Sequence, residues 1–261
     1  MILGEKTIKN RHPVIQFAFD YFSRPNKNRF EIVDILRGLA VVQMMVFHFC
    51  FLLKEFRIAF LDFSYNANWA AFRIVIVTMF LSLVGVSLKI AWERGLKPKS
   101  YYRRLAQLFV YGLALSITTY LIAPSRTVIF GILQFILVAS ILGLVFIRFV
   151  WINLFLGIAI VWFGFNYSNS VFNQDGLWWI GMVTRSPVTL DYVPMFPWFG
   201  LVLIGIFIGH FVVSLPKLEP LKNWHAKDLV SRTLALTGRH SLTLYMAHVP
   251  IFFVFIYLFI A

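Results

Sequence analysis

The chain has 261 residues, of which 60% are hydrophobic and only 13% are charged, and 29 of them are phenylalanine. A soluble globular domain has about 25% charged residues, so this composition excludes an ordinary soluble protein. Apolar runs of about 20 residues, the length that crosses a bilayer core, recur from Ile32 almost to Ala261. The sequence therefore predicts an all-α, polytopic bundle of transmembrane helices in contact with membrane lipids.

The net charge of +13 is distributed as in a membrane protein and not as in a nucleic-acid-binding protein. Lysines and arginines cluster in alternate loops instead of along one solvated face, so we expect no nucleic-acid partner. The single cysteine, Cys50, lies in the first apolar run, and no disulfide can therefore form within the chain.

Hydropathy predicts about seven spans, with eight as the upper limit. They cover residues 32–53, 69–91, 104–123, 127–147, 150–166, 194–214 and 241–260. Residues 1–30 form a basic arm that lacks the short apolar core and cleavage site of a signal peptide. Residues 31–261 then form a single transmembrane domain.

The basic residues also predict the orientation of the spans. A cytoplasmic N-terminus places eighteen lysines and arginines inside and five outside, with Arg37 in the first span itself. This bias predicts an N-in, C-out topology, and we expect a bacterial cytoplasmic (inner) membrane. The longest outer segment, from Tyr167 to Val193, is rich in Asn, Trp and Asp, and we expect it to cap an outward-facing cavity.

The first span, "DILRGLAVVQMMVFHFC", contains three ionisable residues that are costly in hydrocarbon. At 100° per residue, Asp34, Arg37, Met45 and His48 lie within about 80° of one another, so they face protein or water. Arg37 and His48 are about 16 Å apart along the helix axis. Asp34 and Arg37 can simply form an ion pair one turn apart, and His48 can simply bond a neighbouring helix. A neutral imidazole beyond the midplane is also suited to proton transfer.

The last span, "GRHSLTLYMAHVPI", carries a second polar ridge. Ser241, Tyr245 and His248 lie on one face of this helix at i, i+4 and i+7. They can hydrogen-bond neighbouring helices, or His248 can orient His48 or serve as a second acid or base. Asp34 and Arg37 lie too far along the first span to contact His48.

The segment "LDYVPMFPWFG" places Asp191 just before an outer helix start that contains Pro194 and Pro197. Proline is tolerated in a first turn, and a carboxylate is favoured there by the helix dipole, so Asp191 can be a simple cap. The sequence has no metal-ligand cluster, phosphate loop or serine nucleophile elbow, and we expect no metal.

Six motifs together resemble a known family. They are "DILRGLAVVQMMVFHF", "FLSLVGVSL", "YYRRLAQLF", "VIFGILQFI", "DYVPMFPWFGLVLIGIFIG" and "GRHSLTLYMAHVPI", from about Phe30 to Ile251. Their order and spacing are similar to those of the heparan-α-glucosaminide N-acetyltransferase catalytic-domain family, a group of transmembrane acyltransferases. The spacing from Arg37 to His48 also resembles the Arg, ten residues, His signature of bacterial membrane O-acyltransferases.

The resemblance implies transfer of an acetyl (acyl) group from cytosolic acetyl-CoA to a sugar or glycan acceptor on the outer side. Animal members of the family use a histidine in the first outer loop, and "LKEFRIAFLDFSYNANWAAFR" has none, so His48 is the natural substitute. The expected catalytic residues are His48, His248, Asp34 and Arg37, with His48 either as a general base or as a transient carrier of the acetyl group. The CoA phosphates need a basic site, expected at Arg103, Arg104, Arg239 and Arg37. The acceptor is expected at Asp191, Trp198, Arg73 and Tyr245.

Two other classes of function remain open. A transporter or flippase of a small polar or glycan-lipid substrate also has polar stripes inside a helix bundle, although the sequence lacks the matched broken helices of inverted repeats. A membrane scaffold would use the same residues only for packing. Retention of acetyl-CoA by the purified protein separates the enzyme from both. A homo-oligomer is compatible with all three.

Overall fold

The computed structural model describes residues 30–59, 66–222 and 224–260. This part of the chain is largely helical and contains no β-strand, which confirms the predicted all-α bundle. Its α-helices are α2 (Glu31–Glu55), α3 (Ala67–Glu93), α4 (Pro98–Ile122), α5 (Ile132–Phe146), α6 (Trp151–Asn166), α7 (Met195–Ser214), α8 (Glu219–Lys222), α9 (Leu229–Arg239) and α10 (Ser241–Phe259). The predicted basic arm lies outside the described residues except for Phe30.

The chain is an integral membrane protein. Five of its helices, α2, α3, α4, α7 and α10, are long and apolar enough to cross a membrane. Helices α5 and α6 are apolar but have only 15 and 16 residues, or about 23 Å at 1.5 Å per residue, which is less than a typical hydrocarbon core of about 30 Å. The predicted fourth and fifth spans are therefore short helices.

The helix of the fourth span begins a few residues after the approximate start predicted from hydropathy. Residues 127–131 are non-helical, and α5 begins only at Ile132. The preceding segment is held by hydrogen bonds from Val193 N to Phe130 O (3.3 Å) and from Val128 N to the Thr119 hydroxyl (3.1 Å). Apolar side chains made this segment look helical in the hydropathy profile, but its backbone pairs with the long loop before α7.

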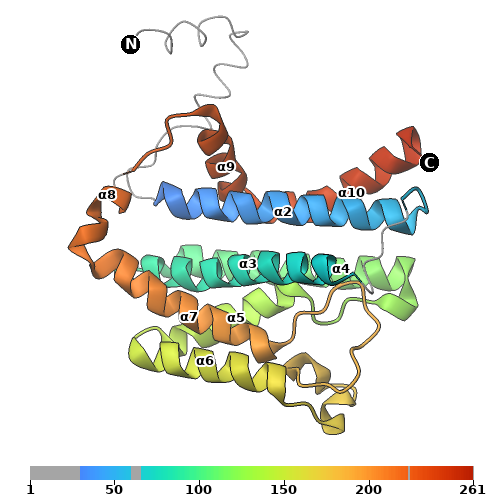
Figure 1. Ribbon diagram of the computed structural model, residues 1–261, viewed down its shortest axis with the longest axis horizontal. Coiled ribbons are helices and arrows are strands. Elements are labelled where there is room, and N and C mark those ends of the chain that lie inside the picture. The colour runs from blue at the N-terminus through green and yellow to red at the C-terminus, as the bar shows by residue number, and fades with distance from the viewer. Residues whose placement is uncertain (1–29, 60–65, 223, 261) are drawn as a thin grey trace, which may run out of the picture.

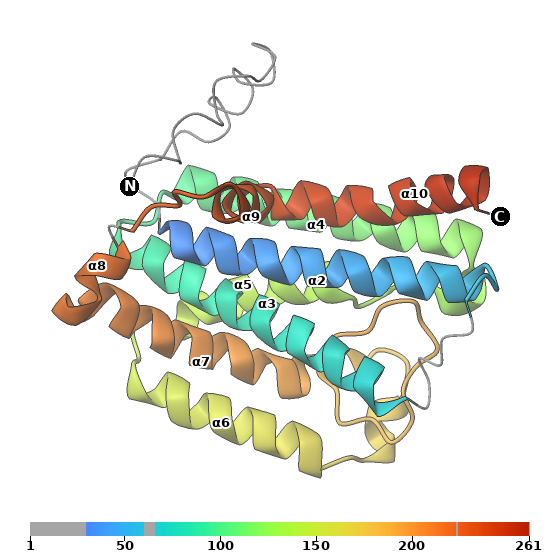
Figure 2. The same ribbon diagram turned by 45° about the horizontal axis from the view of Figure 1, so that its top comes forward.

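The longer helices run roughly along one long axis, whereas the short helix α9 crosses it, as Figures 1 and 2 show. In both views α2 lies along α3, α7 lies on the other side of α3, and α6 covers α7. The start of α2 and the end of α10 lie at opposite ends of the bundle. This arrangement is the one that an odd number of crossings requires, while the direction of the topology remains a prediction.

Close backbone contacts between helices depend on glycine. A Cβ atom on Gly85 of α3 would lie 2.0 Å from the Val202 carbonyl oxygen of α7, and one on Gly238 of α9 would lie 1.8 Å from the Asp34 carbonyl oxygen of α2. Small residues at helix crossings are typical of membrane proteins, where close packing replaces the hydrophobic effect between helices. The second crossing fixes α9 against the start of α2.

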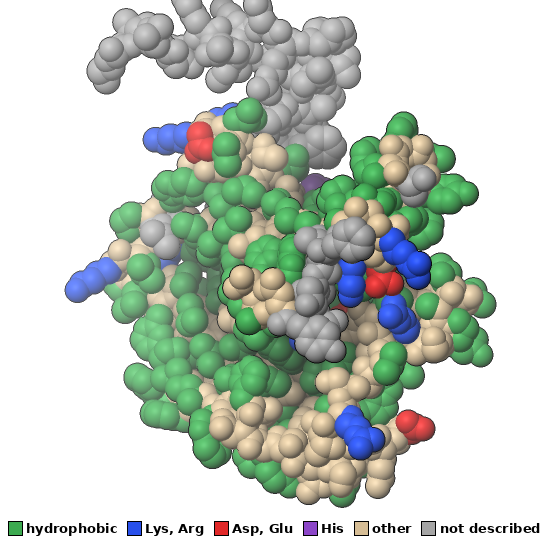
Figure 3. Space-filling view, turned by 45° about the vertical axis from the view of Figure 1, so that its right-hand side comes forward, with side chains coloured by type: hydrophobic (Ala, Val, Ile, Leu, Met, Phe, Trp, Pro, Cys, Tyr) green, Lys and Arg blue, Asp and Glu red, His purple; other side chains and the backbone are tan. Residues whose placement is uncertain are grey.

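The main core lies among α3, α4, α5 and α7, where Leu81, Phe135 and Val202 are fully buried. A smaller cluster joins α2 to α3 around Val41, Met44 and Ile76, with Tyr245 of α10 packed against it. Figure 3 shows hydrophobic side chains over most of the visible face and charged ones at only a few places. Such a surface is expected for helices that face lipid.

Candidate active site

The structure brings together two histidines from opposite ends of the sequence. His48 is in the fifth turn of α2, and His248 is in the second turn of α10. The Nδ1 atom of His48 lies 2.9 Å from Nε2 of His248, and the two ring centroids are 4.9 Å apart. His248 is 3% exposed, whereas His48 is half-buried. The pair therefore has one deeply buried member and one more accessible member.

Aromatic rings surround this histidine pair. Phe47 packs edge-on against His48, with ring centroids 5.7 Å apart, and Phe252 packs edge-on against His248 at 6.0 Å. The ring of Tyr245 lies 5.6 Å from that of His248. These rings leave the imidazoles little freedom to turn and form an apolar wall around the contact.

Asp191 connects the long loop before α7 to two helices. Its Oδ2 atom accepts a hydrogen bond from the N–H of Ile132 (2.8 Å) and lies 3.5 Å from the hydroxyl of Tyr245. Asp191 thus caps the start of α5, and not the start of α7 as the sequence suggested. Burial raises the pKa of Asp191, although hydrogen bonds from Ile132 and Tyr245 and the charge of Arg73 oppose the shift.

Three of the four residues expected to bind the acceptor therefore lie near one another. Tyr245 contacts Asp191, and Arg73 of α3 is close enough for its charge to act on that carboxylate. Because Tyr245 also lies beside His248, this polar group is continuous with the histidine pair. Trp198 of α7 packs elsewhere, with its ring 6.3 Å from that of Phe165 on α6.

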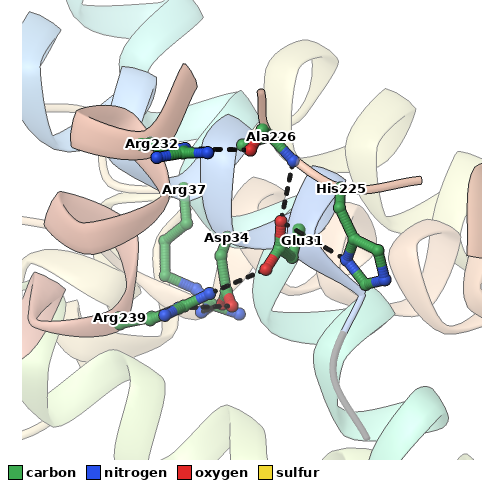
Figure 4. Close-up of polar contacts among 7 residues, drawn as sticks. All are labelled: Glu31, Asp34, Arg37, His225, Ala226, Arg232 and Arg239. Carbon is green, nitrogen blue, oxygen red and sulfur yellow. Dashed lines mark hydrogen bonds and ion pairs between the residues drawn. The ribbon is translucent and has the colours of Figure 1, made fainter. Parts of the chain in front are cut away.

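A cluster of charges lies at the start of α2, where Figure 4 shows Glu31, Asp34, Arg37 and Arg239 with their dashed contacts. Arg37 Nη1 and Asp34 Oδ1 are 3.0 Å apart, so these residues form the ion pair that their spacing allows. Arg239 Nη2 lies 3.0 Å from Glu31 Oε1, and its Nε lies 3.6 Å from Asp34 Oδ2. These contacts join α9 to α2.

The same cluster also connects to α3 and to the segment before α9. Arg37 Nη2 donates to the Ser87 hydroxyl of α3 (2.6 Å), and Glu31 Oε2 accepts from the Ala226 N–H (2.9 Å). At about 1.5 Å per residue, Arg37 and His48 are about 16 Å apart along α2. The structure therefore separates the four residues expected to be catalytic into the histidine pair and this charge cluster.

Arg103 and Arg104 lie inside α4 and not at its entrance, because the helix begins earlier than predicted, with Pro98 in its first turn. Both side chains are exposed. Arg104 is close enough to Arg37 for the two positive charges to interact. Arg104 thus adds a positive charge beside the charge cluster to which Arg37 belongs.

The loop from Tyr167 to Val193 lines two pockets. One, of about 320 Å³, is bordered by Asn173, Asp175, Trp178 and Arg185. The other, of about 280 Å³, lies at the end of α6 and is bordered by Tyr192. The hydroxyl of Tyr192 donates to the Trp178 carbonyl oxygen (2.6 Å). Burial raises the pKa of Tyr192 to about 12, so this hydroxyl keeps its proton.

Two residues of these networks, Glu31 and Ser87, were not predicted from the sequence. Glu31 is 4% exposed and contacts both Arg239 and the segment before α9. The spacing of Glu31 was a usable signal. Glu31 lies three residues before Asp34, and residues at this spacing share one face of a helix. Ser87 gave no such signal, because serine is common at helix contacts in membranes.

A family model described as "Heparan-alpha-glucosaminide N-acetyltransferase, catalytic" matches residues 29–250. Neither the comparison with curated proteins nor the comparison with solved structures found a match. The matched region includes the charge cluster, Asp191 and both histidines of the pair. Because the match covers most of the sequence, the chain belongs to the heparan-alpha-glucosaminide N-acetyltransferase catalytic-domain family, and hence to a family of membrane acetyltransferases.

Proposed function

We propose that this protein transfers an acetyl group from acetyl-CoA on the cytoplasmic side to a sugar or glycan acceptor on the outer side, with His48 as the general base. The observation that carries the proposal is the contact of 2.9 Å between His48 and His248 inside a helix bundle of an acetyltransferase family. A half-buried imidazole with one nitrogen held by a partner and the other able to reach a substrate is a common arrangement for a catalytic base.

The reaction needs one proton acceptor. His48 takes a proton from the hydroxyl or amine of the acceptor while the acceptor oxygen or nitrogen attacks the thioester carbonyl carbon. The carbon–sulfur bond then breaks, and the proton passes from His48 to the departing sulfur, which leaves as the thiol of CoA. The products are the acetylated acceptor and CoA, and His48 returns to its neutral form.

We propose that the donor phosphates bind near the start of α2, at Arg37, Arg103, Arg104 and Arg239. The proximity of Arg104 to Arg37 supports this site, because Arg37 already pairs with Asp34 and the added charge of Arg104 favours an anion nearby. The distance of about 16 Å from Arg37 to His48 requires a long, thin group between the phosphates and the thioester. The pantetheine arm of CoA is such a group.

We propose that the acceptor approaches from the opposite end, where the long loop, Asp191, Arg73 and Tyr245 lie. The support is the contact between Tyr245 and Asp191 and the position of Tyr245 beside His248. A carboxylate and an arginine are suitable partners for sugar hydroxyls or an amino group. Trp198 remains a prediction for this site, although its ring packs against Phe165.

The proposal is tested with purified protein in lipid vesicles, acetyl-CoA labelled in the acetyl group, and glucosamine or a lipid extract as acceptor. The expected result is that the protein binds acetyl-CoA and that the label moves to the acceptor while CoA thiol appears in equal amount. A transporter would move a substrate without releasing CoA. Failure of the folded protein to bind acetyl-CoA would contradict the proposal.

A further inference from the structure

The hydrogen bonds of His248 determine which of its ring nitrogens carries hydrogen. Its Nδ1 atom lies 2.6 Å from the carbonyl oxygen of Tyr245 and 3.2 Å from that of Leu244, both on its own helix. Carbonyl oxygens only accept hydrogen bonds. The Nδ1 atom must therefore carry the hydrogen, because an imidazole lone pair at 2.6 Å from a carbonyl oxygen would be repelled.

We infer that His248 is a positioning residue that fixes the tautomer of His48, so that Nε2 of His48 is the nitrogen that accepts the proton in catalysis. This inference rests on the proposed function. A neutral His248 with hydrogen on Nδ1 has only a lone pair on Nε2. His48 Nδ1, 2.9 Å away, must then donate to it. The hydrogen of neutral His48 is thus on Nδ1, and its Nε2 has a free lone pair.

The reverse arrangement has a clear cost. If His48 accepted through Nδ1, His248 would have to donate through Nε2 while Nδ1 still donated to the two carbonyl oxygens. That form is a positively charged imidazolium in a residue that is 3% exposed, and burial of a charge with only neutral partners is unfavourable. Free histidine in water prefers hydrogen on Nε2, so the contact with His248 favours the less common form, in a ring that also has a hydrogen bond to the backbone of Met44.

The contact also stabilises the charged state during turnover. When Nε2 of His48 takes the acceptor proton, the ring becomes an imidazolium whose Nδ1–H points at the lone pair of His248. The Nδ1–H of His248 in turn points at two carbonyl dipoles. The chain of hydrogen bonds therefore leads from the base to backbone oxygens. It resembles the arrangement in which a third group orients a catalytic histidine, with a neutral imidazole in place of a carboxylate.

The direct test is nitrogen NMR of the full-length protein in lipid, with ¹⁵N in the histidine side chains and the signals of His48 assigned by their loss in His48→Ala. The expected spectrum of His48 is that of a neutral ring with hydrogen on Nδ1. A neutral ring with hydrogen on Nε2 in active protein would overturn the inference. The tautomer is read from the unmodified protein, and folded His48→Ala serves only to assign the signals.

Kinetics of two variants give a second test. In His248→Gln the amide oxygen can accept from His48 Nδ1, whereas His248→Leu has no acceptor. We expect kcat to fall by about 10-fold or more in His248→Leu and to be partly restored in His248→Gln, with the KM for acetyl-CoA unchanged in both. Equal activity of the two folded variants would contradict the role of His248. An unaffected His48→Ala would instead refute the proposed function, so the two failures are distinguishable.

Discussion

Glu31 and Arg239 lie 208 positions apart in the sequence, and their side chains form an ion pair of 3.0 Å that joins the start of α2 to the end of α9. Both side chains are largely buried, with 5% and 13% exposure. Removal of one partner from a buried pair leaves an uncompensated charge, which typically costs 3–5 kcal/mol, whereas loss of both partners costs less.

We therefore expect Glu31→Gln to lower the free energy of unfolding by roughly 3 kcal/mol, and the double variant Glu31→Gln/Arg239→Gln to be less destabilised than the sum of the single variants. Thermal unfolding in detergent, analysed as a double-mutant cycle, measures this coupling. Additive effects of the two substitutions would show that the ion pair does not stabilise the fold.

The crossing of α2 and α9 gives a second prediction. A Cβ atom on Gly238 would lie 1.8 Å from the Asp34 carbonyl oxygen, so Gly238→Ala must push the helices apart. Overpacking of this kind typically costs about 1–3 kcal/mol, and we expect a lower unfolding temperature. Gly112→Ala is the matched control, because its Cβ would meet only side-chain atoms of Gln134, at 3.4 Å. An equal effect of both substitutions would contradict the steric account.

Asp191 gives a third prediction, because it accepts hydrogen bonds from two elements that are distant in the sequence. Asp191→Ala leaves the Ile132 N–H and the Tyr245 hydroxyl without this acceptor. The expected loss of stability is about 1–3 kcal/mol. Asp191→Asn keeps an acceptor oxygen and should lose much less. Thermal unfolding of the two variants checks the order, and equal losses would mean that the carboxylate acts through its charge and not through these bonds.

The proposed donor site gives a fourth prediction. Arg104→Gln should weaken acetyl-CoA binding by about tenfold, because loss of one charge contact with phosphate typically costs about 1.5 kcal/mol. Arg126→Gln is the control, since Arg126 lies in the turn after α4 and pairs with Glu55. Titration of acetyl-CoA into each purified protein measures the affinity. Equal affinities of the Arg104 and Arg126 variants would remove Arg104 from the donor site.

The sequence predicted most of the helices, but it did not predict which loops and side chains contact them. Long apolar runs gave the spans because a bilayer imposes their length, but residues 127–131 look helical by hydropathy and instead pair with the loop before α7. Asp191 precedes α7 in the sequence, and only the folded chain brings it to the start of α5. A cap supplied by a distant loop has no signature in a local pattern.

The candidate site shows the same division. His48 and His248 were each identifiable because an ionisable residue in an apolar helix is costly and rarely without a role. Their direct contact depends on how α2 packs against α10, which no local pattern encodes. The position of Arg239 between Glu31 and Asp34 also depends on tertiary packing, whereas the ion pair of Asp34 and Arg37 followed from their spacing alone.

The central claim is that His48 is the catalytic base, and His48→Ala tests it most directly. The measurement is the rate of acetyl transfer by purified protein in lipid, together with acetyl-CoA affinity and the unfolding temperature. The control is His210→Ala, which removes a histidine from α7, where the ring packs against Phe211. We expect His48→Ala to lose about 10²- to 10⁴-fold in rate while it stays folded and binds acetyl-CoA normally, and His210→Ala to keep its rate. Transfer by folded, donor-bound His48→Ala at the unmodified rate would contradict the account.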